Sequence, residues 1–133
     1  MNLYLDPSAL VKRYVAEPGS PTVRRAMTES EGWFMCRIGF VETARAVELA
    51  AGPIPANSFR GEWPAFGVIE VDQGLADRAA QLAVKHNLRS LDSLHLAATL
   101  LVPVRDLVLA TWDQGLHAAG RAEGLRLLPS RLV

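Results

Sequence analysis

The chain has 133 residues, half of them hydrophobic, and its 14 basic and 14 acidic side chains leave no net charge. A chain of this length buries roughly two-thirds of its unfolded surface, enough for one full core, so we expect a single domain over residues 1–133. The neutral total argues against a general nucleic-acid coat protein. No apolar run approaches the ~20 residues of a membrane span, no basic leader precedes an apolar stretch, and the single cysteine excludes an internal disulfide. We therefore expect a cytoplasmic protein that makes no membrane contact.

Hydrophobic periodicity predicts strands and helices that alternate along the chain. Short apolar runs predict strands at residues 2–6, 32–36, 68–71, 107–111 and 125–129. Apolar stripes at helical spacing predict helices at residues 8–15, 21–30, 37–50, 72–87, 90–102 and 113–124. Prolines and glycines predict a loop with one helical turn at residues 52–67. The alternation indicates an α/β fold, a three-layer α/β/α sandwich around a mostly parallel five-stranded sheet.

Three groups of apolar side chains carry expectations about burial. In the helix over residues 37–50 we expect buried positions at Ile38, Val41, Ala44 and Leu49. The aromatic residues of the expected loop belong either to the core or to an apolar patch for a partner or second subunit; they are Phe59, Trp63 and Phe66. The first helix carries an apolar stripe that also suggests a contact surface, made by Leu10, Val11 and Tyr14.

Four acids are expected at one edge of the sheet. Asp6 follows the first strand in "LYLDPS", and Asp113 follows the fourth in "LATWDQGL". With the strand order 3-2-1-4-5, strands one and four are neighbours, so these two carboxylates converge at the carboxyl edge where α/β proteins place their sites. Glu42 and Asp92 lie early in helices that begin near the same edge.

Each acid also has a simpler interpretation. Asp6 and Asp113 can cap the helices that follow them, Asp92 can complement a helix dipole, and Glu42 can pair with Arg45 on the surface. Any one of these interpretations is plausible, and for Asp6 the cap is the more probable one when the residue is considered alone. Four such coincidences at one sheet edge are much less probable than one.

Four segments in order, "YLDPSALVKRY", "GFVETARA", "LRSLDSLHLAA" and "LATWDQGL", resemble the successive motifs of the PIN-domain family, in particular the VapC-type toxins of bacterial toxin–antitoxin pairs. The single motifs are weak, but the ordered set is specific and covers essentially the whole chain. The resemblance implies four catalytic acids that hold divalent metal: Asp6, Glu42, Asp92 and Asp113. It also implies that the hydroxyls of Ser8 and Thr111 support the site. The chain departs from the family at Cys36, where Ser or Thr is expected, and at Gln114, where a further polar or acidic residue often helps.

The chemistry of clustered carboxylates agrees with this resemblance. Two unit charges about 5 Å apart repel by roughly 3 kcal/mol at an effective dielectric near 20, so a cluster of four needs a cation. Oxygen ligands without cysteine or paired histidine select Mg²⁺ or Mn²⁺ over zinc. The implied reaction is metal-dependent hydrolysis of RNA phosphodiester bonds, with translation-related RNA such as tRNA or rRNA as substrate. The resemblance further implies a homodimer and a cognate VapB-like antitoxin laid across the helices beside the site.

RNA also needs basic side chains near the acids. Without the four site acids, 14 basic residues stand against 10 acidic ones, so the surface around a filled site attracts RNA. Four arginines lie near the motifs and are candidates for contacts to the RNA backbone, or else belong to solvated helix faces: Arg13, Arg37, Arg45 and Arg89. His95, three residues after Asp92, is more often a satisfied helix histidine than a catalyst.

Two other classes of protein have a similar layered fold. A phospho-receiver domain needs an acid pair after strand one and a lysine after strand five, and this chain has neither, although Asp72 stands where an acceptor would. A phosphatase with an Asp-x-Asp motif fails because Ser8 stands at the second acid. The remaining alternative is a non-catalytic binding domain of the same fold, against which the intact acids argue.

Overall fold

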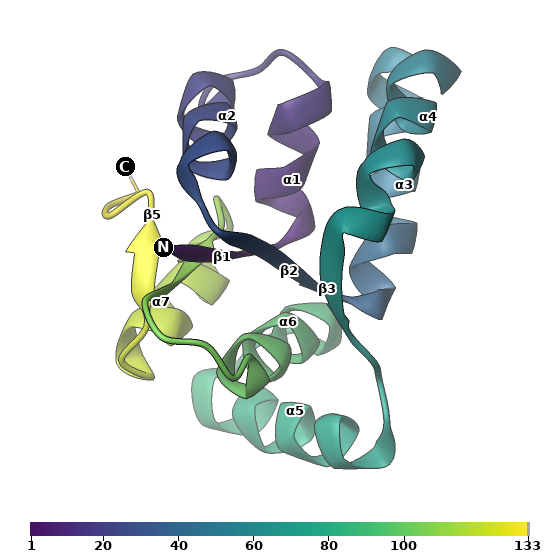
Figure 1. Cartoon of the computed structure of the whole chain (residues 1–133). Helices are drawn as coiled ribbons and strands as arrows, with labels where there is room; N and C mark the ends of the chain where they lie inside the picture. Colours follow the sequence, from purple (N-terminus) through teal and green to yellow (C-terminus); the bar gives the residue numbers. More distant parts are fainter. Residues whose placement is uncertain (133) are drawn as a thin grey trace.

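Five short strands form one sheet in the order β3-β2-β1-β4-β5, and every neighbouring pair is parallel (Figure 1). The strands are β1 (Asn2–Leu5), β2 (Gly32–Cys36), β3 (Phe66–Ile69), β4 (Leu107–Ala110) and β5 (Arg126–Leu128). The computed structural model describes residues 1–132. The order confirms the predicted topology. It places the carboxyl ends of β1 and β4 side by side, with Leu5 opposite Ala110.

Seven helices within the described residues cover the two faces of the sheet, as the α/β/α prediction requires (Figure 1). They are α1 (Pro7–Tyr14), α2 (Ser20–Glu29), α3 (Arg37–Ala51), α4 (Pro53–Glu62), α5 (Gln73–His86), α6 (Ser90–Leu101) and α7 (Gln114–Ala122). Figure 1 shows α1 to α4 on one side of the sheet and α5 to α7 on the other. None of the helices in residues 1–132 is long and apolar enough to cross a membrane.

The expected loop at residues 52–67 is wrong, because this segment forms α4 and a 3₁₀ turn at Trp63–Ala65. Pro53 and Pro55 lie in the first turn of α4, where backbone N–H groups have no intrahelical partner and a proline therefore removes nothing. Strand β3 begins directly after the 3₁₀ turn, at Phe66, two residues earlier than predicted. The prolines mark the start of a helix here and not a loop.

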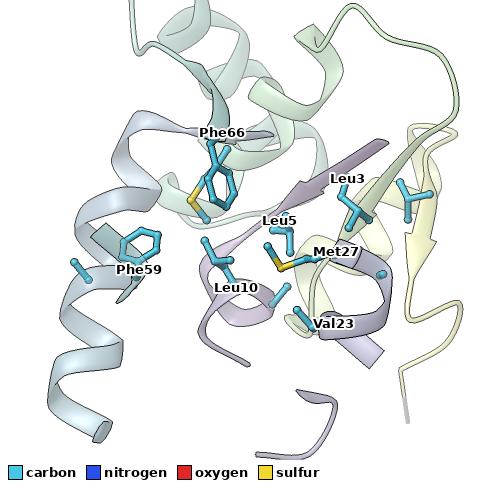
Figure 2. Close-up of a cluster of buried hydrophobic side chains, with 13 residues drawn as sticks. Leu3, Leu5, Leu10, Val23, Met27, Phe59 and Phe66 are labelled. Atoms are coloured by element: carbon cyan, nitrogen blue, oxygen red, sulfur yellow. The ribbon is translucent and has the colours of Figure 1, made fainter. Parts of the chain in front are cut away.

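The alternation of side chains along β1 divides the core into two clusters. Leu3 and Leu5 point to the side of α1 to α4, where they join the cluster that contains Leu10, Phe59 and Phe66 (Figure 2). Tyr4 points the other way, into a cluster with side chains of α5, α6 and α7. Successive residues of a strand face opposite sides of the sheet, so a single strand anchors both layers of helices.

Burial corrects two expectations about apolar surface. Phe59 is fully buried and Phe66 nearly so, which makes these aromatics core residues and removes them, with Leu10, as support for a subunit contact. Val41 and Leu49, expected to be buried, are 59% and 71% exposed. Each lies two residues from a buried position of α3, Thr43 or Val47, and two residues turn a helix to nearly its opposite side.

Candidate active site

Asp6 is both a helix cap and a buried carboxylate. It directly follows β1, and its Oδ1 accepts the Ala9 N–H at 2.9 Å, which confirms the cap interpretation. The same oxygen accepts the Ser8 hydroxyl at 2.7 Å, while Oδ2 accepts the Thr111 hydroxyl at 2.6 Å. The residue is only 3% exposed, and burial raises the pKa of Asp6, an effect that the hydrogen bonds from Thr111 and Ser8 oppose. A helix cap needs only one accepting oxygen, so the burial of the whole carboxylate and the bond to its second oxygen point to a further role.

Ser8 and Thr111 join the ends of β1 and β4. The Thr111 hydroxyl accepts the Asp113 backbone N–H at 3.1 Å, and the Ser8 hydroxyl accepts the Trp112 N–H at 2.9 Å. Both hydroxyls therefore contact Asp6 on one side and the segment that carries Asp113 on the other. This arrangement suits the supporting role expected for the two residues.

Asp113 and Asp92 lie close to each other, and Arg89 contacts both. Asp113 caps α7, accepting the Leu116 N–H at 2.8 Å, and Asp92 lies in the first turn of α6. Burial raises the pKa of Asp92, and the neighbouring charge of Asp113 raises it further. The Arg89 guanidinium lies 3.7 Å from Asp92 and 3.8 Å from Asp113, with its side chain 86% exposed. The two carboxylates are thus close enough to repel, and an exposed cation balances them.

Glu42 pairs with His95, and not with Arg45 as the surface interpretation has it. His95 Nε2 lies 2.8 Å from Glu42 Oε1, and His95 Nδ1 lies 2.7 Å from the Tyr4 hydroxyl. The imidazole is almost completely buried, as expected for a satisfied helix histidine. The sequence did not predict that His95 contacts Glu42 or that Tyr4 contacts His95. The only signal in the sequence is the spacing of His95 from Asp92, which puts both on one face of a helix.

The four arginines proposed for RNA differ in their surroundings. Arg13 donates two hydrogen bonds to Glu62, at 2.9 and 2.8 Å, so its guanidinium is engaged by α4. Arg37 pairs with Glu70 in the same bidentate way, but on an exposed surface. Arg45 and Arg89 are exposed. Arg13 is therefore the least available of the four to an RNA backbone.

The donor chemistry of the site fits a hard divalent cation, although the side chains do not form a complete metal cage. Within residues 1–132, no three His, Cys, Asp or Glu side chains come together closely enough to hold an ion directly. The four acids nevertheless supply only oxygen donors, and two of them, Asp6 and Asp92, have pKa values raised by burial. Mg²⁺ and Mn²⁺ prefer such oxygens and keep several waters, so a few protein ligands suffice.

Comparison with known proteins identifies the family. A model of the PIN domain matches residues 3–121. The chain belongs to the PIN-domain family. This PIN domain is similar to Ribonuclease VapC45 of Mycobacterium tuberculosis, with 30% identity over 98% of this chain and 96% of that protein.

Solved structures share the PIN-domain fold. VapC20 of Mycobacterium tuberculosis superposes with a TM-score of 0.76 and 16% identity, over 89% of this chain and 95% of that one. The PIN domain also resembles a chain of a toxin–antitoxin complex from Klebsiella pneumoniae, with a TM-score of 0.67 and 18% identity, over 84% of this chain and 86% of that one. At these identities the superpositions establish the common fold. Together with the family match, they confirm the resemblance inferred from the ordered motifs.

Proposed function

We propose that this PIN-domain protein is a Mg²⁺- or Mn²⁺-dependent endoribonuclease of the VapC type and acts in the cytoplasm as the toxin of a type II toxin–antitoxin pair. The observation that carries this proposal is the buried Asp6 at the carboxyl edge of the sheet, linked through Thr111 to the segment of Asp113. Asp92 belongs to the same group, because the charge of Asp113 raises its pKa. A helix cap alone does not require a carboxylate that is buried and hydrogen-bonded through both of its oxygens.

Each acid has a separate part in the proposed reaction. Asp6, Asp92 and Asp113 hold the ion, directly or through water, and Glu42 holds a second ion or orients the attacking water. The ion supplies stabilisation of the negative charge that develops on the phosphate and makes water more acidic. Ser8 and Thr111 fix both oxygens of Asp6, so that its carboxylate does not rotate.

Exposed arginines are suited to hold the RNA. Arg89 lies beside Asp92 and Asp113 with most of its side chain in solvent, so its guanidinium can contact a phosphate next to the scissile bond. Arg37 and Arg45 lie on α3, the helix that carries Glu42. In this proposal they contact phosphates of the RNA farther from the scissile bond. The proposed substrate is a translation-related RNA, tRNA or rRNA. The relatives support this class, since one is named a ribonuclease and VapC20 is described as a toxin that cleaves the sarcin–ricin loop.

The test is cleavage of purified tRNA and rRNA, followed by analysis of the new ends. Hydrolysis by water gives a 5′-phosphate and a 3′-hydroxyl, and cutting should stop in EDTA and return with Mg²⁺ or Mn²⁺. Asp6→Asn should abolish cleavage. Asp72→Asn is the matched control, because Asp72 caps α5 through a 2.8 Å bond to the Leu75 N–H but is exposed and lies outside the acidic group. Cyclic phosphate ends, or full activity in EDTA, would contradict the mechanism.

An exposed apolar surface beside Glu42 is the proposed docking site of a VapB-like antitoxin. Val41 and Leu49 of α3 and Ile54 of α4 are exposed, and a groove of about 340 Å³ runs between Val41, Leu49 and Arg60. Val41 directly precedes Glu42 in the chain, so a segment bound here would lie beside the site. The similarity to a chain of a toxin–antitoxin complex supports such a partner.

The antitoxin proposal is tested by co-purification with any small protein encoded next to this chain. Leu49→Glu should weaken the complex and release nuclease activity, whereas Val84→Glu should not, because Val84 is also exposed but lies on α5. Equal effects of the two substitutions would contradict the assigned surface. The proposed homodimer is checked separately by sedimentation, and a strict monomer at high concentration would exclude it.

A further inference from the structure

A buried chain of hydrogen bonds leads from the backbone of β2 to Glu42. The Cys36 N–H donates to the Tyr4 hydroxyl at 2.9 Å, the hydroxyl lies 2.7 Å from His95 Nδ1, and His95 Nε2 lies 2.8 Å from Glu42 Oε1. Tyr4 is fully buried, and His95 is 1% exposed. No other hydrogen bond of these two side chains is formed among residues 1–132. The positions of the protons on Tyr4 and His95 are therefore determined by neighbouring protein groups and not by solvent.

Only one placement of the protons satisfies all three contacts. The Tyr4 oxygen already accepts the Cys36 N–H, so its own proton needs an acceptor, and His95 Nδ1 is the one in reach. Nδ1 is then unprotonated, and the ring proton lies on Nε2, from which it is donated to Glu42. With the proton on Nδ1 instead, the Tyr4 proton would be buried without an acceptor, and the Nε2 lone pair would face a carboxylate oxygen.

A glycine provides the space for this imidazole. Gly39 lies one turn before Glu42 on α3, and a Cβ added to it would stand 2.5 Å from Met35 Sδ and 3.1 Å from His95 Cε1. Cε1 is the ring carbon between the two nitrogens, and both nitrogens are held by hydrogen bonds. The ring thus has little freedom to move away from a methyl group. The glycine of "GFVETARA" allows α3 to approach His95 closely enough for Glu42 to reach Nε2.

We propose that His95 is a positioning residue, which Tyr4 holds as the neutral Nε2–H tautomer so that it fixes one oxygen of Glu42 for the divalent ion. Outer partners of this kind set the orientation of a ligand carboxylate, and their loss commonly weakens ion binding about 10- to 100-fold. The proposal rests on the proposed function for the ion, whereas the tautomer itself can be tested without any ion or RNA.

The first experiment determines the tautomer by long-range ¹H–¹⁵N correlation of the imidazoles in ¹⁵N-labelled full-length protein in EDTA, with His95→Gln used for assignment. The expected pattern is that of a neutral ring protonated at Nε2. A neutral ring protonated at Nδ1, or a doubly protonated ring, would overturn the inference.

The second experiment compares two variants that keep different halves of the imidazole. The amide of Gln reaches as far from Cβ as Nε2 does, so His95→Gln keeps a donor for Glu42, whereas the shorter Asn replaces only Nδ1. Binding of Mn²⁺ alone is followed by the electron paramagnetic resonance signal of the free ion. We expect affinity within about 3-fold of the parent for His95→Gln and at least about 10-fold weaker for His95→Asn. His86→Asn is the control, since His86 forms a similar 2.6 Å pair with Glu123 away from the acidic group, and it should leave Mn²⁺ affinity unchanged.

Thermal melts of both His95 variants in EDTA separate positioning from folding. If His95 is merely structural, Mn²⁺ affinity should follow the loss of stability, and equal weakening in the two variants would overturn the inference. A parent that binds no Mn²⁺ would overturn the ion assignment and the role of Glu42 together. A parent that binds Mn²⁺ and shows the expected tautomer, but cleaves no RNA, would contradict only the proposed nuclease function.

Discussion

Replacing Asp6 by Asn or by Ala separates its role as a helix cap from its role as an ion ligand. Ala removes the acceptor of three hydrogen bonds, from the Ala9 N–H and from the Ser8 and Thr111 hydroxyls. Loss of a cap costs about 1 kcal/mol, and a buried donor left without a partner costs about 1–3 kcal/mol. We therefore expect Asp6→Ala to lower the free energy of unfolding by about 2–4 kcal/mol in EDTA at pH 7. Asn keeps an acceptor at Oδ1, and its stability should lie within about 1 kcal/mol of the parent or above it.

The pH dependence of stability predicts whether the Asn variant is more or less stable than the parent. Burial raises the pKa of Asp6 in the folded state, so the folded chain binds this proton more tightly than the unfolded chain does. Stability then decreases as pH rises from the unfolded value, about 4, through the raised folded value. Asn has no such proton. The Asn variant should therefore gain stability relative to the parent between acidic and neutral pH, while both proteins keep a further slope of the same sign from Asp92.

Urea denaturation at several pH values, with EDTA or with Mn²⁺, measures all of these quantities. At 100 times its dissociation constant, Mn²⁺ should stabilise the parent by about 2.7 kcal/mol and should stabilise neither variant to this extent. If Asn destabilises as strongly as Ala in EDTA, the carboxylate charge is needed for the cap. If Mn²⁺ stabilises both variants as much as the parent, Asp6 is not a ligand and the reasoning is refuted.

Three further substitutions test two packed positions of α3 and one ion pair by urea denaturation. Thr43 is fully buried and its hydroxyl has no hydrogen-bond partner within residues 1–132, so Thr43→Val should raise the free energy of unfolding by about 1 kcal/mol; a decrease would reveal a hidden partner. Gly39→Ala should lower it by about 1–3 kcal/mol because the new methyl group crowds Met35 and His95, whereas a gain from helix propensity would show that both side chains can move. Glu62→Gln should lose about 1 kcal/mol at pH 7. The hydrogen bond from Arg13 lowers the pKa of Glu62, so this difference should decrease as pH falls from about 4 through the lowered folded value, and a difference that persists below that value would exclude the charge as its cause.

The sequence by itself determined where the strands lie and which acids follow them. Buried parallel strands appear as short continuous apolar runs. In "LYLD" an acid directly follows such a run, and in "LVLATWD" an acid lies two residues after one. Asp6 and Asp113 could therefore be placed at one sheet edge before any contact was known. The cap of Asp6 is equally local, because it involves a backbone N–H only three residues away.

Only the tertiary structure decided which residues Glu42 and His95 contact. His95 lies 53 residues from Glu42 and 91 from Tyr4 in the chain, and periodicity within one helix carries no information about partners so distant. The dependence on distant contacts also explains why α4 was not predicted. Its prolines are compatible with a helix only in the first turn, and Phe59 packs into a core cluster made by residues far away in the chain. This dependence also explains Val41 and Leu49, whose exposure depends on which face of α3 packs inward. Local patterns indicated most of the strands and helices. Which side chains meet depends instead on how the helices pack against one another, and this packing involves residues from the whole chain.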